Sequence, residues 1–261
     1  MKKILIVLCA YLTVALMPFG SIADESRPNA DEKKLENYIS SIYKHLDFHN
    51  SDRLSYDVFQ KAYKGYLNLR NAGKLSYDRE ILTVCDMNLP SSENRLWVID
   101  LANGKIVFNT YVAHGQGSGD ECAESFSNSF NSHQTSLGFY VTGETYNGDH
   151  GLSLRLNGMD NGYNDAAIDR GIVVHGACYV SEQYIAGNAR LGRSWGCPAV
   201  PDKLKVPIIN AIQGGTCLFI YYQDNDYLKA AYWLNKTPEI PQQNSMYDEL
   251  LMMQKALKNK K

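Results

Sequence analysis

Apolar positions along the chain change their spacing as the sequence proceeds, and each spacing predicts a different structure. An unbroken apolar run occupies residues 4–19, and polar sequence begins at Asp24. Between residues 29 and 71 the apolar side chains recur every three or four positions, which predicts two amphipathic helices, the second beginning after Ser55 and ending near residues 71–73. The expected buried positions are Leu35, Ile39, Ile42, Tyr43 and Leu46, then Val58, Phe59, Ala62, Tyr63, Tyr66 and Leu67.

From about Glu80 the pattern becomes typical of strands. Two runs at 95–101 and 105–113 are joined across Asn103-Gly104, which is a strong signal for a hairpin. Other runs rich in β-branched or aromatic residues predict strands at 81–85, 137–142, 152–156, 171–175 and 216–222, with a Gly-, Ser- and Asn-rich loop at 115–132. Helices are expected at 203–213, after Asp224, and again from Ser245 beyond a proline-containing break at 238–241.

The first 23 residues have the three parts of a secretory signal peptide. Lys2 and Lys3 precede the apolar run, and Ser21-Ile22-Ala23 places small residues where signal peptidase reads them. The apolar run is shorter than the roughly 20 residues that a transmembrane helix needs. We therefore expect cleavage after residue 23 and a periplasmic protein that is not an integral membrane protein; an uncleaved anchor is the alternative.

The remaining chain, residues 24–261, is long enough for one sizeable domain with an accessory segment, or for two small domains. We predict an α+β fold with a strand-rich, β-sandwich-like core at 80–223, a helical N-terminal segment at 24–79 and a helical C-terminal tail at 224–261. The formal net charge is −2, and −4 once Lys2 and Lys3 are removed. Such a balance does not favour nucleic acid as a partner.

Cysteine content bears on the redox state of the protein. One of the six cysteines lies in the signal segment, and the other five are Cys85, Cys122, Cys178, Cys197 and Cys217. In an oxidising compartment an odd number leaves at least one thiol unpaired. The other four allow two disulfides in three connectivities, and a fully reduced set is equally compatible with the sequence. A regulatory bridge between Cys178 and Cys197 is a further hypothesis.

Two segments have the residue types that nucleophilic catalysis needs. An apolar run ends at His175-Gly176, and Cys197 follows 22 residues later in a glycine-containing turn. A thiol with a pKa of about 8.5 is mostly protonated at neutral pH, so a histidine within hydrogen-bond reach can activate it and later protonate the leaving amine. Backbone amides at a glycine turn can stabilise the oxyanion. The spacing alone does not show that the two side chains meet.

These segments resemble the L,D-transpeptidase (YkuD-type) catalytic domains, and most closely the murein L,D-transpeptidase branch. The family pairs His-Gly with a downstream Ser/Thr-His-Gly-Cys, and this chain has His175-Gly176 and Ser194-Trp195-Gly196-Cys197. The segments that carry the resemblance lie within about residues 80–222 and are Val112–Gly115, Ser136–Tyr140, Gly151–Leu156, Val174–Ala177 and Gly192–Val200.

The resemblance implies acyl transfer on peptidoglycan without a cofactor. Cys197 would attack the carbonyl of an L-residue bonded to a D-residue in a tetrapeptide stem and release the terminal D-amino acid. The acyl group would then pass to an amine of a second stem or of an acceptor protein. The family further implies a histidine oriented by a backbone carbonyl, acylation of Cys197 by carbapenem-type β-lactams, and an oxyanion site at the backbone of Gly196, Cys197, Trp195 and Gly176.

Two departures from the family pattern affect the expected substrate contacts. Trp195 replaces the histidine before Gly-Cys, and Pro198-Ala199 replaces an apolar residue followed by Arg or Asn. Another cation would then have to bind a substrate carboxylate. The candidates for substrate binding are Arg193, Ser194, Arg155 and His114, with Arg190 and Arg170 as further sources of positive charge.

Other functions remain open at this stage. The same acyl-enzyme could be hydrolysed, which would make the protein an L,D-carboxypeptidase or an amidase, because the outcome depends on how the acceptor site excludes water. A non-catalytic peptidoglycan-binding protein is the third possibility. We expect no metal, because the histidines and cysteines that lie in loop-like sequence lack the spacing of metal ligands; they are His114, His133, His150 and Cys122.

Overall fold

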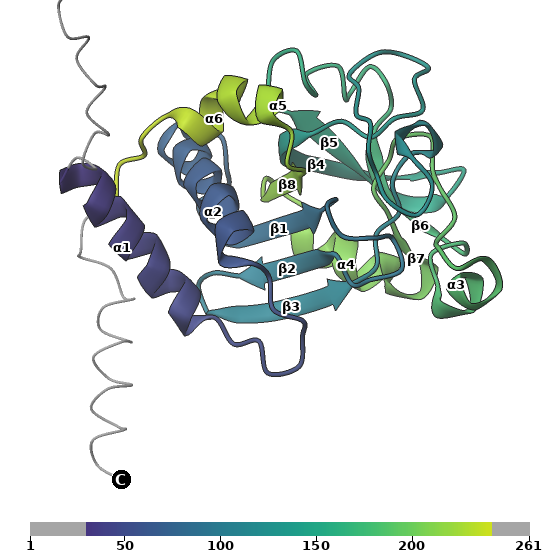
Figure 1. The fold of residues 1–261 in the computed structure, drawn as a ribbon, viewed down its shortest axis with the longest axis horizontal. Helices are drawn as coiled ribbons and strands as arrows, with labels where there is room; N and C mark the ends of the chain where they lie inside the picture. The colour runs from purple at the N-terminus through teal and green to yellow at the C-terminus, as the bar shows by residue number, and fades with distance from the viewer. Residues whose placement is uncertain (1–29, 242–261) are drawn as a thin grey trace, which may run out of the picture.

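The structure, a computed structural model, describes residues 30–241 (Figure 1). The helices are α1 (Ala30–His45), α2 (Tyr56–Asn71), α3 (Glu182–Asn188), α4 (Lys205–Ile212), α5 (Asn225–Ala230) and α6 (Tyr232–Asn235). The strands are β1 (Ile81–Asp86), β2 (Leu96–Asp100), β3 (Lys105–Thr110), β4 (Gly138–Gly148), β5 (Gly151–Gly158), β6 (Val173–Ala177), β7 (Ala199–Pro201) and β8 (Cys217–Tyr221). The predicted signal peptide and the predicted helix from Ser245 lie outside the described residues.

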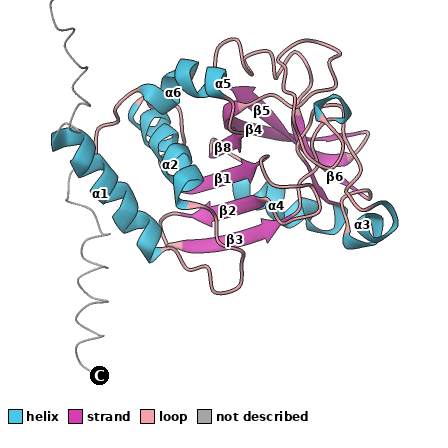
Figure 2. Ribbon diagram, viewed as in Figure 1, coloured by secondary structure: helices cyan, strands magenta, loops and turns pink. Residues whose placement is uncertain are grey.

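The eight strands form one sheet in the order β3-β2-β1-β8-β4-β5-β6-β7. Figure 2 shows the strands in magenta. The β1–β8 and β6–β7 pairs are parallel, and the other neighbours are antiparallel. The hairpin predicted at Asn103-Gly104 is confirmed as β2–β3, and Gly104 adopts the left-handed conformation with a φ of 61°. The predicted α+β fold, with a strand-rich core and helical flanks, is therefore confirmed.

The sheet curves until its two ends nearly meet, as in a barrel. The chain leaving β3 crosses to the far edge, where Ala113 donates its N–H to Ala199 O on β7 at 2.8 Å. Gly115 forms a second bridge with Ser194, just before β7. These contacts bring the loop after β3 against the turn that contains Cys197, at the end of the molecule away from α1 (Figure 1).

The two N-terminal helices share one hydrophobic core with the sheet. Both predicted apolar faces are buried, and α2 packs against β1, β8 and α6. At Gly65 a Cβ atom would lie 2.0 Å from the Phe139 ring, so glycine allows α2 to approach β4 closely. Phe139 in turn stacks on Phe219 of β8, with ring centroids 4.1 Å apart. The N-terminal helices are therefore an integral part of the core.

Four elements differ from the sequence-based expectation. β4 extends to residue 148, past the predicted end at 142, because a register shift between Thr142 and Thr145 lets its polar second half continue to pair with β5. β6 ends at Ala177, so His175 lies inside the strand and not at its end. β7 and α3 were not predicted; β7 has only three residues, one of them proline, which is too short to show an alternating pattern.

Candidate active site

Strand pairing brings His175 and Cys197 to the same region of the sheet. His175 on β6 lies opposite Ala199 on β7, and extending this register by two residues places Cys197 opposite Val173. In agreement, the Val173 N–H donates to Cys197 Sγ at 3.5 Å. The sulfur also lies 3.7 Å from Gly171 O. Two residues along a strand span about 7 Å, and within residues 30–241 no hydrogen bond joins the sulfur directly to the imidazole.

The His175 imidazole is oriented by a backbone carbonyl. Its Nδ1 lies 3.0 Å from Gly176 O. Because a carbonyl can only accept, Nδ1 carries the proton and Nε2 is the basic nitrogen. Burial lowers the pKa of His175; the Gly176 carbonyl raises it, and charge on His150 and Lys205 lowers it again. The ring is therefore neutral at neutral pH, the form that a general base requires.

The Cys197 thiol needs a base. Burial raises the pKa of this thiol, while the Val173 N–H and the positive charge of Arg170 lower it by smaller amounts. The net effect is upward, so the resting side chain is a thiol at neutral pH and becomes a nucleophile only when its proton is removed. Cys197 as a whole is half-buried.

The turn before Cys197 is closed by Ser194. The Ser194 hydroxyl donates to Cys197 O at 2.6 Å and accepts from the Gly196 N–H at 3.1 Å. Gly196 has a φ of 119°, and a Cβ atom there would lie 2.7 Å from Gln134 O, so only glycine fits. The Gly196 N–H is therefore not a free donor for an oxyanion, contrary to the predicted role, because it already donates to the Ser194 hydroxyl.

The backbone amides of Trp195 and Cys197 are the remaining donors of this turn. Within the described chain, neither N–H donates to a backbone or side-chain oxygen. Gly176, another residue predicted for the oxyanion site, lies inside β6 opposite Val200. Gly176 contributes to the site through its carbonyl, which orients His175.

A loop that sequence reasoning overlooked clamps the Cys197 turn. The Thr135 hydroxyl donates to Gly196 O at 3.3 Å and accepts from the Gly115 N–H at 3.0 Å, so one buried side chain joins three segments. The Arg170 guanidinium donates to Gln134 O at 2.9 Å and to Ser127 O at 2.8 Å. No local pattern distinguishes Thr135 from the other polar residues of its loop.

His114 is buried, which is inconsistent with its predicted contact with substrate. Its side chain has no exposed surface, and its Nδ1 accepts from the Arg95 guanidinium at 2.7 Å. Arg95 is also fully buried and donates to Val112 O at 3.0 Å and Leu89 O at 2.8 Å. Burial, with the charge of Arg95 second, lowers the pKa of His114 to about 4. His114 is therefore a neutral structural side chain.

The other predicted cations differ in how available they are. Arg193 and Arg190 both pair with Asp120, at 3.0 and 2.9 Å, and so hold the loop after β3. Arg155 on β5 lies opposite Val173, and directly opposite residues of neighbouring strands project to the same face. Its side chain is 42% exposed, with a long 3.5 Å ion pair to Glu144. Its guanidinium also lies 4.6 Å from the centroid of the Tyr146 ring. Of these three arginines, Arg155 has the most exposed side chain.

Two ring stacks beside the site were not predicted. Trp195, 71% exposed, stacks on His133 with ring centroids 4.8 Å apart and planes 5° apart. The His150 ring stacks on His175 at 4.2 Å and 19°. From the sequence, His133 and His150 were candidates only as metal ligands. Among residues 30–241, no group of three or more His, Cys, Asp or Glu side chains could hold a metal ion.

The five cysteines of the described chain are free thiols. Cys85 and Cys217 are buried in β1 and β8, whereas Cys122 and Cys178 are exposed. The proposed bridge between Cys178 and Cys197 remains a prediction.

Between residues 30 and 241, none of the helices combines the length and apolar character needed to cross a bilayer.

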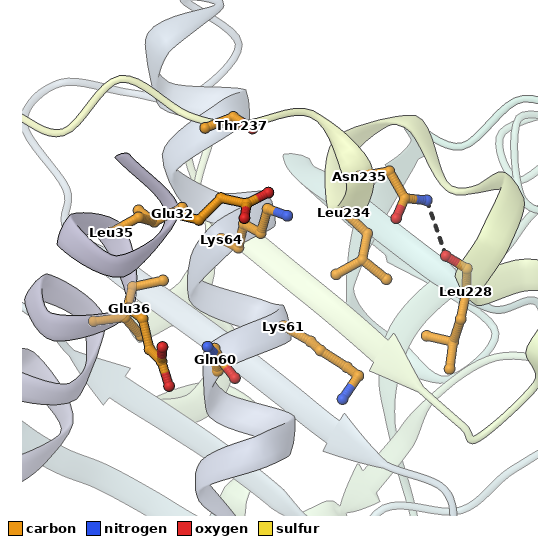
Figure 3. Close-up of a pocket in the computed structure, with 11 residues that line it drawn as sticks. Glu32, Leu35, Glu36, Gln60, Lys61, Lys64, Leu228, Leu234, Asn235 and Thr237 are labelled. Atoms are coloured by element: carbon orange, nitrogen blue, oxygen red, sulfur yellow. Dashed lines mark hydrogen bonds between the residues drawn. The ribbon is translucent and has the colours of Figure 1, made fainter. Parts of the chain in front are cut away.

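A cavity of about 460 Å³ lies away from these residues, between α1, α2 and the α5–α6 segment (Figure 3). Its walls combine apolar side chains such as Leu35 and Leu234 with charged ones such as Glu36 and Lys64. None of the predicted site residues lines it. We therefore assign it no part in the chemistry of Cys197.

Comparison with known proteins identifies the family. The chain matches the family YkuD_2, described as L,D-transpeptidase catalytic domain, over residues 50–221, and it belongs to that family. The match begins at residue 50, before the predicted start of the core at 80, in agreement with the place of α2 in the shared core. No curated protein matches the chain.

Several solved structures are similar to the chain. An L,D-transpeptidase from Mycobacterium smegmatis is 12% identical, with 55% of this chain and 59% of that chain covered and a TM-score of 0.35. One from Stackebrandtia nassauensis is 16% identical, with 78% and 87% covered and a TM-score of 0.33. One from Xylanimonas cellulosilytica is 13% identical, with 72% and 93% covered and a TM-score of 0.32. The chain thus spans less than two thirds of the Mycobacterium smegmatis chain.

Proposed function

We propose that this protein is a secreted cysteine L,D-transpeptidase that acts on tetrapeptide stems of peptidoglycan through a Cys197 acyl-enzyme. The observation that carries the proposal is the β6–β7 register, which sets Cys197 opposite Val173, two residues from His175 on the same strand. Membership of the L,D-transpeptidase catalytic domain family supports the reaction class. The predicted signal peptide supports action in the periplasm.

Acylation would begin with a rotation of the Cys197 side chain. The sulfur now contacts Gly171 O and the Val173 N–H, and rotation about its Cα–Cβ bond turns it toward His175. Nε2 of His175 takes the thiol proton, and the thiolate attacks the carbonyl carbon of the L-residue. As the C–S bond forms, the carbonyl electron pair moves to oxygen, where the amides of Trp195 and Cys197 stabilise the oxyanion.

Collapse of this intermediate breaks the C–N bond, and His175 returns its proton to the departing D-amino acid. A thioester on Cys197 remains. The amine of a second stem, or of an acceptor protein, then gives a proton to His175 and attacks the thioester. A new C–N bond forms, the C–S bond breaks, and the thiolate recovers the proton from His175, so no cofactor is consumed.

Two exposed side chains are suited to contact the substrate. Arg155 on β5 lies opposite Val173, the residue that Cys197 also faces across β6, and would bind a stem carboxylate. Trp195 is stacked on one face by His133, whose ring is held by the Gln116 side chain at 2.9 Å, and is otherwise exposed. We propose that this rigid ring lies along the substrate entering the site.

The test is incubation of the protein with purified disaccharide-tetrapeptides and analysis of the products by mass. We expect cross-linked dimers, free D-amino acid and an acyl adduct on Cys197. Cys197→Ala should reduce the rate by about 10⁴-fold or more, because it removes the nucleophile. Cys178→Ala, which removes an exposed thiol three residues after His175, is the matched control and should keep the wild-type rate.

Other products would select other functions. Tripeptides without dimers would show that water resolves the acyl-enzyme, as in an L,D-carboxypeptidase. Identical, unchanged substrate with wild type and Cys197→Ala would contradict catalysis and favour a binding protein. Sequencing the N-terminus of the exported protein tests the predicted cleavage after residue 23.

A further inference from the structure

The tip of the β4–β5 hairpin covers the His175 imidazole. His150 lies between the last residue of β4 and the first of β5, and its ring stacks on His175 with centroids 4.2 Å apart and planes 19° apart. His150 itself is exposed, whereas His175 is only 2% exposed. The His150 ring thus lies between the catalytic imidazole and solvent.

The hairpin tip is anchored from a different element. Lys205, the first residue of α4, donates from Nζ to His150 O at 3.4 Å and pairs with Asp202 at 2.8 Å. Gly151 has a φ of 71°, and a Cβ atom there would lie 3.3 Å from Lys205 Nζ. At Gly176 a Cβ atom would lie 2.7 Å from Lys205 Cδ. Two glycines therefore leave the space through which Lys205 reaches the tip.

The charged and titratable groups around His175 come from three sides. His150 stacks on it from the hairpin, Lys205 and Asp202 lie at and just before the start of α4, and Cys197 lies in the turn before β7. Parallel imidazoles at this distance repel strongly when both are protonated, and Lys205 adds a positive charge. A neutral aromatic ring, in contrast, is favourable beside a cation and excludes water from it.

We propose that His150 is a positioning residue: its ring, held by Lys205, caps His175 and keeps the imidazole oriented and in its neutral, proton-accepting form. When His175 takes the Cys197 proton, the imidazolium forms beneath the neutral His150 ring. Positive charge on the His150 ring opposes proton acceptance by His175. The low-pH loss of Cys197 reactivity is therefore a property of the histidine pair and not of His175 alone. This inference deepens the proposed function and rests on it for the role of His175.

The direct test is an NMR titration of the His175 ring in the wild type and in His150→Phe, which keeps a ring at the same place without a charge. We expect the pKa of His175 to rise by about one unit in His150→Phe, because a repelling partner has gone. His49→Phe, at an exposed histidine in the α1–α2 loop, is the matched control and should leave His175 unchanged.

A second measurement reports on the thiol. The rate of Cys197 alkylation by iodoacetamide is followed against pH in a Cys122→Ser/Cys178→Ser background, where the other exposed thiols are absent. His150→Phe should keep the maximal rate within about twofold and shift the low-pH loss upward by about one unit. His150→Ala should show the same shift and also a severalfold lower maximum, because the cap is lost. Lys205→Met should shift the loss in the same direction.

Neither measurement requires peptidoglycan, so the two proposals can fail separately. If the wild type leaves muropeptides unchanged while His150→Phe still shifts the His175 titration, the proposed function fails and the role of His150 stands. An unshifted His175 in His150→Phe, or an alkylation profile identical in wild type, His150→Phe and His150→Ala, would overturn the inference whether or not the wild type forms cross-links.

Discussion

The two ends of the sheet are stabilised by different kinds of contact. Strands β1, β2 and β8 are almost entirely buried and pack against α2 and α4, so apolar burial holds this end together. At the other end, β7 has only three residues, and the turn before it, which contains Cys197, is held by hydrogen bonds from Ser194 and Thr135. Burial is non-directional, whereas hydrogen bonds depend on geometry. The candidate active site lies where orientation is controlled by directional contacts.

The comparison implies that stability and reactivity can be altered separately. Substitutions in the apolar end should lower the free energy of unfolding and leave the Cys197 site intact in the molecules that remain folded. Substitutions in the hydrogen-bonded end should alter the reactivity of Cys197 for a smaller loss of stability.

The largest effect on stability is expected from Phe139→Ala. Phe139 is fully buried between Gly65 of α2 and Phe219 of β8, so the substitution leaves a cavity where helix and sheet meet. We expect a loss of about 3–5 kcal/mol in the free energy of unfolding, measured by urea denaturation. Val107→Ala, at a more exposed position on β3, is the control with a small effect. A changed alkylation rate of Cys197 in folded Phe139→Ala would show that stability and Cys197 reactivity cannot be altered separately.

An intermediate effect is expected for His114→Gln, which should remove part of the pH dependence of the free energy of unfolding. The pKa of His114 is about 4 in the folded protein and about 6.5 when unfolded. Above pH 6.5 this histidine is neutral in both states. As the pH falls to 4, the unfolded state takes up a proton before the folded state does, so the free energy of unfolding of the wild type falls by about 3 kcal/mol. Glutamine can still accept from Arg95 but does not titrate, so this loss should be absent from urea denaturation curves of His114→Gln.

Asp160 supplies an internal control of opposite sign. Burial raises the pKa of Asp160 to about 6. As the pH falls from 6 toward 4, the folded state therefore takes up a proton before the unfolded state does, and this group raises the free energy of unfolding. Asp160→Asn removes this gain, so it should change the pH dependence of the free energy of unfolding in the direction opposite to His114→Gln. Parallel pH dependences in wild type and His114→Gln would show that His114 is not buried as described.

The smallest loss of stability, together with a clear loss of reactivity, is expected for Thr135→Val. Valine has nearly the same shape but removes the donor to Gly196 O and the acceptor for the Gly115 N–H. We expect about 1–3 kcal/mol of destabilisation and a slower alkylation of Cys197, followed by mass spectrometry. Thr135→Ser keeps the hydroxyl and should restore most of the reactivity. Equal rates in wild type and Thr135→Val would show that the clamp does not position the turn.

Elements with a repeating pattern were predictable from the sequence. The amphipathic spacing of α1 and α2 and the Asn103-Gly104 hairpin depend on residues that are close in the chain, so the pattern itself contains the information. The His175-Gly176 and Ser194–Cys197 segments likewise identified the family from contiguous residues. These predictions needed no knowledge of which distant segments pack together.

Contacts between distant segments decided the rest of the candidate site. Thr135 contacts Gly196 across 61 residues, and the stack of His150 on His175 joins a hairpin tip to another strand. His114 was expected at the substrate because it follows a strand-like run, but closure of the sheet buries it against Arg95. The sequence by itself determined the local elements and the reactive residue types. Only the tertiary structure decided which polar side chains are buried, clamped or stacked, because those states depend on neighbours that strand order and sheet curvature bring together.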